Sequence, residues 1–156
     1  MVCEYQLKRN GNGMGVSAIT KTLLSAYKDL EDQCQTIDGL MVSYAVRSSK
    51  RDIFVCADRM FRYTNEKIAL INAKVLVDET FEKMGQKTSL KFYFIDKKSK
   101  HHRISLETAE KQLQEFNDLL FEAYTATKLF DMISDSKFLM KIYSGYARQE
   151  LKQGAK

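Results

Sequence analysis

Apolar and polar positions alternate most clearly between residues 88 and 106. Leu90, Phe92 and Phe94 stand at every second position, which is the period of a strand with one buried face. The polar segment DKKSKHH at 96–102 predicts a turn, and 103–106 predicts a returning strand. A hairpin that leads directly into a helix is therefore predicted here.

Helical spacing flanks this hairpin on both sides. Ser17 is a suitable N-cap for a helix that reaches about Gln35, and Gly39 marks the break after it. Ser105 caps a second helix that extends toward Phe130, and a final helix covers about 137–152. The apolar faces of the first two helices comprise Ile19, Leu23, Tyr27, Leu30 and Cys34, and Leu106, Ala109, Leu113, Phe116, Leu120 and Ala123.

The middle of the chain favours short strands because Val, Ile and aromatic residues are frequent there. The expected strands are 40–46, 53–56, 60–63 and two within 67–77. A helix over 58–84 stays open as an alternative, because Ile68, Ile71 and Val75 also fit helical spacing. Short apolar runs cannot be assigned by periodicity alone.

Composition narrows the class of protein. The chain has 156 residues, 44% of them apolar, which is typical of one globular domain. Its net charge of +5 mildly favours anionic partners. No apolar run approaches a membrane span, and the N-terminus lacks the apolar core of a signal peptide. Cys3, Cys34 and Cys56 are odd in number and widely spaced. We expect reduced thiols in the cytoplasm, with the nucleus as an alternative.

Four segments carry a family resemblance. They are IFVCADRMFRYT (53–64), KIALINAKVLV (67–77), SLKFYFID (89–96) and RISLETAEKQLQEFNDLL (103–120). Residues 40–125 thus resemble a pleckstrin-homology-like domain of the PH/PTB superfamily. The resemblance implies an α+β fold, in which a small bent antiparallel sheet or partly open barrel is closed by a C-terminal helix. Phe116 stands where the family usually has a Trp.

The pattern and the resemblance together predict four parts of the chain. They are a flexible N-terminus (1–15), an N-terminal helix (16–38), the pleckstrin-homology-like domain (39–130) and a basic amphipathic C-terminal helix (131–156).

Two basic clusters are candidate binding sites for anions. Arg47, Lys50 and Arg51 occupy the loop where the resemblance implies phosphoinositide contacts. The second cluster lies at the predicted hairpin tip and comprises Lys97, Lys98, Lys100 and Arg103. Clustered cations attract an anionic lipid surface or a nucleic acid in a salt-dependent way. The simpler interpretation is a solvated turn.

The final helix is a candidate partner-binding helix. Its basic side comprises Lys137, Lys141, Arg148 and Lys152, and its adjoining apolar side includes Phe138, Ile142 and Tyr146. Such a helix can dock on a protein or lie on an anionic membrane. It can equally pack on its own domain, because a wide apolar face seldom stays exposed on a monomer.

No motif predicts catalysis, a cofactor or a metal site. His101 and His102 are adjacent, so on a strand they would point to opposite faces. The GNGMG segment at 11–15 lacks the Lys-Ser/Thr that a phosphate-binding loop requires. We therefore expect no enzyme and no small-molecule substrate.

Three hypotheses follow. The first is a noncatalytic interaction module, an adaptor or complex subunit that binds a protein partner and possesses basic loops suited to an anionic lipid surface. The second is an RNA-binding or ribonucleoprotein subunit that uses 97–103. The third is an α/β scaffold of the longin or roadblock kind, which requires a helix at 58–84.

Overall fold

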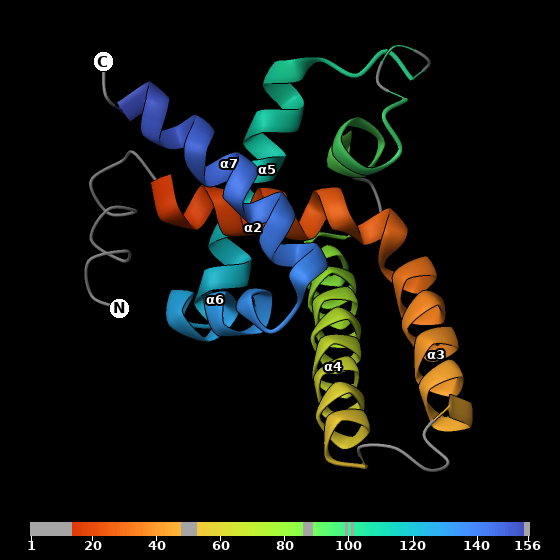
Figure 1. Cartoon of the computed structure of the whole chain (residues 1–156). Helices are drawn as coiled ribbons and strands as arrows, with labels where there is room; N and C mark the ends of the chain where they lie inside the picture. Colours follow the sequence, from red (N-terminus) through yellow and green to blue (C-terminus); the bar gives the residue numbers. More distant parts are fainter. Residues whose placement is uncertain (1–13, 48–52, 86–88, 99, 101, 155–156) are drawn as a thin grey trace.

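The structure, a computed structural model, describes residues 14–47, 53–85, 89–98, 100 and 102–154. Its regular elements are helices, and the described residues contain no strand. In chain order they are α2 (Met14–Ala26), the short η1 (Tyr27–Asp29), α3 (Leu30–Arg47), α4 (Ile53–Met84), the short η2 (Lys91–Ile95), α5 (Leu106–Ala123), α6 (Ala126–Ser134) and α7 (Lys137–Gly154). Figure 1 shows how they are arranged.

The predicted pleckstrin-homology-like α+β fold is therefore wrong, and with it the bent sheet or partly open barrel closed by a C-terminal helix. The segments predicted as strands at 40–46 and 53–77 lie inside α3 and α4. Val and Ile cost only a few tenths of a kcal/mol in a helix relative to good helix formers. The helical period of α4 buries Leu70, Leu76 and Val77 in the core, and burying one such side chain contributes about 1.5–3 kcal/mol. Tertiary packing therefore overrides the local preference.

The alternating segment around Phe92 also forms a helical turn rather than a strand. In η2 the backbone N–H of Asp96 donates to the carbonyl of Lys91 at 3.0 Å, and that of Lys98 donates to Phe92 at 2.8 Å. The buried residues of this turn are Leu90 and Ile95, five positions apart. Phe92, Tyr93 and Phe94 between them are all half-buried, so the expected alternation of buried and exposed side chains is absent.

Helix α2 lies at the centre of the molecule. Thr20 and Thr22 are buried along with Ala18, Ile19 and Leu23, so the helix is enclosed on most sides. Helix α7 crosses it closely, and α4, α5 and α6 also contact it (Figure 1). The N-terminal helix predicted to run to about Gln35 instead changes direction at η1, and α3 continues through Gly39 to Arg47.

The C-terminal third begins at its predicted cap, but the helix expected to extend toward Phe130 ends at Ala123, and α6 begins at Ala126. Ser105 Oγ accepts a hydrogen bond from the Thr108 N–H at 3.1 Å, which confirms this residue as the N-cap of α5. Thr125 and Ser136 cap α6 and α7 in the same way. The interruption predicted at 134–136 separates these two helices.

Phe116 is fully buried, as the periodicity of α5 predicts, but it closes no sheet. Its ring packs against Phe81 of α4 at a centroid separation of 5.1 Å. Beside it, the Thr20 hydroxyl donates to Asn117 Oδ1 at 2.6 Å, and this buried hydrogen bond connects α2 to α5. The aromatic residue thus belongs to a helix–helix core.

Helices α3 and α4 form an antiparallel hairpin that extends beyond the other helices (Figure 1). The helix at 58–84 that the third hypothesis required is present within α4, but its α/β frame is wrong because the described residues hold no strand. Within the described residues, no helix is both long and apolar enough to cross a membrane.

Candidate functional site

The predicted basic clusters lie far apart. Lys97, Lys98, Lys100 and Arg103 are exposed in the connection between η2 and α5, where Lys97 and Arg103 have positive φ angles of 54° and 53°. Arg47 ends α3 at the opposite extremity of the molecule (Figure 1). Lys50, Arg51 and His101 lie outside the described residues. The structure therefore does not bring Arg47 and the 97–103 cluster into one surface.

Helix α7 is part of the core. Leu139 is fully buried, and Phe138 and Ile142 pack against the core cluster. The hydroxyl groups of Tyr146 and Ser25 are 2.6 Å apart, which connects α7 to α2. The predicted basic side stays exposed, since the side chains of Lys137, Lys141, Arg148 and Lys152 face solvent. The apolar side of this candidate partner helix is therefore already occupied by its own domain.

The most unusual surface lies elsewhere, on the α3–α4 hairpin. Among the described residues, nine of the eleven large apolar side chains that are exposed belong to these two helices. They are Leu40, Val42, Val46, Phe54, Val55, Phe61, Ile68, Ile71 and Val75. Isolated exposed apolar residues are ordinary, but a concentration on one structural unit is characteristic of an interaction surface.

Five of these residues form a continuous stripe along α4. The α4 stripe consists of Phe54, Phe61, Ile68, Ile71 and Val75. The residues at seven-position intervals, 54, 61, 68 and 75, are 89%, 66%, 50% and 46% exposed, and at about 100° per residue they fall within about 60° around the helix axis. A seven-residue apolar repeat is typical of helices that pair side by side.

Contacts between the two helices hold this surface in place. Lys67 Nζ lies 2.6 Å from Asp38 Oδ1, and Lys74 Nζ lies 3.9 Å from Glu31 Oε2. Nearer the tip, the rings of Tyr44 and Tyr63 are 5.7 Å apart. The polar groups thus face the seam between the helices, and the α4 stripe is left to solvent.

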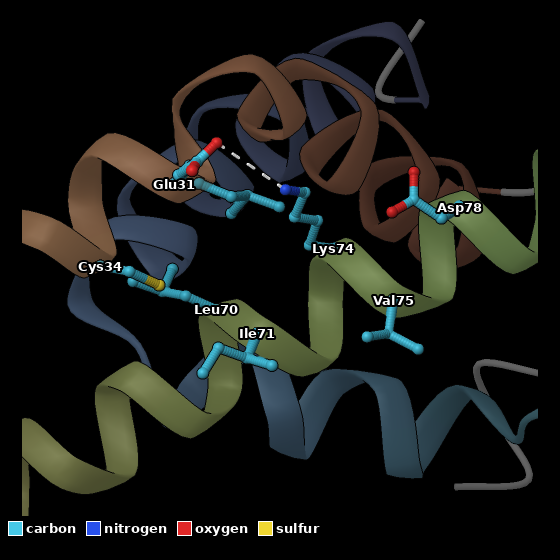
Figure 2. Close-up of a pocket in the computed structure, with 8 residues that line it drawn as sticks. Glu31, Cys34, Leu70, Ile71, Lys74, Val75 and Asp78 are labelled. Carbon is cyan, nitrogen blue, oxygen red and sulfur yellow. Dashed lines mark ion pairs between the residues drawn. The ribbon is translucent and has the colours of Figure 1, made fainter.

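A groove of about 370 Å³ follows this seam. It is lined by Leu30, Glu31, Cys34, Leu70, Ile71, Lys74, Val75 and Asp78. Figure 2 shows Lys74 reaching toward Glu31 across it, with Ile71 and Val75 of the α4 stripe on the same helix. The groove is mostly apolar, with charged groups at its margin, which suits an apolar side chain better than a charged ligand.

The titratable groups beside the groove are not activated for chemistry. Burial raises the pKa of the Cys34 thiol, so the unreactive protonated form predominates at neutral pH. Burial, and then a hydrogen bond to Asp78, raise the pKa of Tyr27 to about 12. Both groups therefore keep their protons at neutral pH.

A second, polar pocket of about 290 Å³ separates α4 from the α6–α7 junction. Its basic residues Arg59, Arg62 and Lys137 are accompanied by Glu66 and Asp135. Arg62 pairs with Asp58 at 3.1 Å, and Arg59 lies over the Tyr44 ring. These local contacts engage two of its cations. In the described part of the chain, no three His, Cys, Asp or Glu side chains are placed to hold a metal ion.

The α4 stripe was not among the residues predicted as a site. Its sequence signal was readable, because Phe54, Phe61, Ile68 and Val75 keep a strict seven-residue interval. The segment was interpreted as several strands, in which side chains on one face recur every two residues. The seven-residue interval was therefore not recognised. Comparison of the chain with family models, curated proteins and solved structures found no match.

Proposed function

We propose that the protein is a noncatalytic interaction module, an adaptor or complex subunit that binds a protein partner through the α4 stripe. The observation that carries this proposal is the concentration of exposed apolar side chains on the α3–α4 hairpin. Because the apolar side of α7 is packed against α2, the hairpin replaces the C-terminal helix as the expected docking element.

The chemistry of the surface favours a protein over a polyanion. Helix α4 carries five basic and five acidic residues, so it has no net charge. Nucleic acids and anionic membranes are bound through an excess of Lys and Arg. An uncharged apolar stripe on a long helix instead fits the groove-and-helix pairing of protein complexes.

A reducing compartment, the cytoplasm or the nucleus, is part of this proposal. Cys34 and Cys56 are both free thiols, and burial raises the pKa of Cys34. Unpaired cysteines persist where the glutathione pool keeps thiols reduced.

Site-specific photo-crosslinking tests the docking surface. A benzophenone amino acid replaces Phe61 in the full chain expressed in cells, and Leu151 is the matched control because it is similarly exposed, at 65%, on α7. We expect a discrete protein adduct from position 61 and none from position 151. Loss of the position-61 adduct on adding Phe54→Ser would place the partner on the stripe.

Two outcomes would contradict the proposal. One is equal crosslinking from both positions, or none from either. The other is salt-sensitive retention on RNA or on anionic vesicles that is abolished by Lys97→Glu with Lys98→Glu. That result would assign function to the basic connection between η2 and α5 instead.

A further inference from the structure

The α4 stripe has the dimensions of a helix-pairing interface. Its outermost members, Phe54 and Val75, are 21 positions apart on one uninterrupted helix, which corresponds to about 32 Å along the axis. Three heptads of apolar residues are enough for an identical stripe to pack alongside it. This length exceeds what a short peptide segment would require.

The apolar area matches what a stable dimer buries. A fully exposed Phe presents about 200 Å², so the five partly exposed side chains of the α4 stripe together present roughly 500 Å². A standard interface covers about 800 Å² on each partner, and about 65% of a homodimer interface is apolar. The stripe supplies that apolar share, and its polar flanks supply the remainder.

The two ends of the stripe are complementary in shape. Phe54 protrudes most, whereas Ile71 and Val75 line the groove of about 370 Å³. A groove of this size accepts one aromatic ring. In an antiparallel pair, Phe54 of each copy meets the groove of the other, and Phe61 meets Ile68. The same contact then occurs twice around a two-fold axis, as an isologous interface requires.

Charge favours the same orientation. Residues 53–68 of α4 carry a net charge of +1, from three basic and two acidic residues, and 69–84 carry −1, from two basic and three acidic residues. Antiparallel pairing places each half beside the oppositely charged half and also opposes the two helix dipoles. Because α4 as a whole carries no net charge, pairing through this surface adds no like-charge repulsion to that between two chains of net charge +5.

We infer that the α4 stripe binds the α4 stripe of a second copy of this chain, antiparallel, with Phe54 seated in the partner's groove. This inference rests on the proposed function and names its partner. The resulting pair brings two α3–α4 hairpins together as a four-helix assembly.

Sedimentation equilibrium of the full chain across a concentration series provides the first test. The parent protein is expected to show the mass of a dimer at the higher concentrations. Phe61→Glu is expected to raise the dimer dissociation constant by at least about 30-fold, since a charge would be buried at the interface centre. Leu151→Glu is the matched control and should leave the constant unchanged. Circular dichroism confirms that each variant stays folded.

A double-mutant cycle tests the orientation. Phe54→Ala, Val75→Ala and the double variant are compared by dimer dissociation constant. Because these positions are about 32 Å apart within one helix, coupling between them can arise only across the interface. Antiparallel pairing predicts that the fold-increase in the dissociation constant of the double variant is smaller than the product of the two single fold-increases. A double-variant increase equal to that product would overturn the assigned orientation.

The outcomes separate this inference from the proposed function. A monomeric parent protein, or a dimer that Phe61→Glu leaves intact, overturns the inference. If the position-61 crosslink then joins the chain to a different protein, the interaction module stands with another partner. If no crosslink forms at position 61, both fail.

Discussion

At the scale of single residues, one partly buried carboxyl group of α7 affects stability through its charge. Glu150 of α7 places its Oε1 atom out of contact with solvent, and within the described residues that atom has no hydrogen-bond partner. Burial raises the pKa of Glu150, while a hydrogen bond from Ser17 and the charge of Lys21 oppose the increase. The folded state therefore holds this carboxyl more readily protonated than the unfolded chain does.

The pH dependence of stability follows from the sign of that shift. Between the ordinary glutamate pKa of 4.5 and the higher folded value, the native state binds more protons, so stability falls as pH rises through this window. Glu150→Gln should therefore increase the free energy of unfolding at pH 7 and lose this advantage at pH 4. Urea denaturation at both pH values measures it, with the exposed Glu115→Gln as control. A variant less stable than the parent at pH 7 would contradict the assignment.

At the scale of one element, α3 illustrates why a helix was missed. Gly39 was expected to end a helix, yet α3 continues through it because neighbouring turns pack against α4. Gly85, by contrast, follows α4 with a φ angle of +91°. This left-handed conformation suits glycine and terminates the helix.

Alanine substitution separates these two roles. A Cβ atom at Gly39 would meet nothing within 4 Å, so Gly39→Ala should stabilise the protein by about 0.5–1 kcal/mol through lower chain entropy in the unfolded state. Gly85→Ala should destabilise it by about 1 kcal/mol because the positive φ strains an L-residue. Urea midpoints provide the comparison. A shift of the same sign for both variants would rule out this account.

At the scale of the whole molecule, the first and last described helices are in contact. Helix α7, the last of them, crosses and packs against α2, the first. The region 131–156 was predicted as a separate terminal helix, but the core of the protein includes its residue Leu139. We therefore expect α7 to unfold together with the rest of the structure, not independently.

Leucine truncation on α7 tests this integration. Leu139 is fully buried and Leu151 is exposed on the same helix. Leu139→Ala should cost about 2–5 kcal/mol of stability by leaving a cavity, whereas Leu151→Ala should change it by less than about 0.5 kcal/mol. Circular dichroism and tyrosine fluorescence should report one coincident transition. A small effect of Leu139→Ala would indicate an appended helix.

The sequence by itself determined the Ser105 cap, the break at 134–136, the final helix and the burial of Phe116, but not the end of α5 at Ala123. These features depend on local hydrogen bonds and on a regular apolar spacing, which are written in adjacent residues. Tertiary structure decided residues 30–95, where Val, Ile and aromatic residues suit either a strand or a buried helix and only packing selects between them. It also decided which apolar face stayed exposed. The apolar side of α7 packs against the core of its own chain. The seven-residue repeat of α4 stays exposed, because α3 and the core contact other sides of that helix.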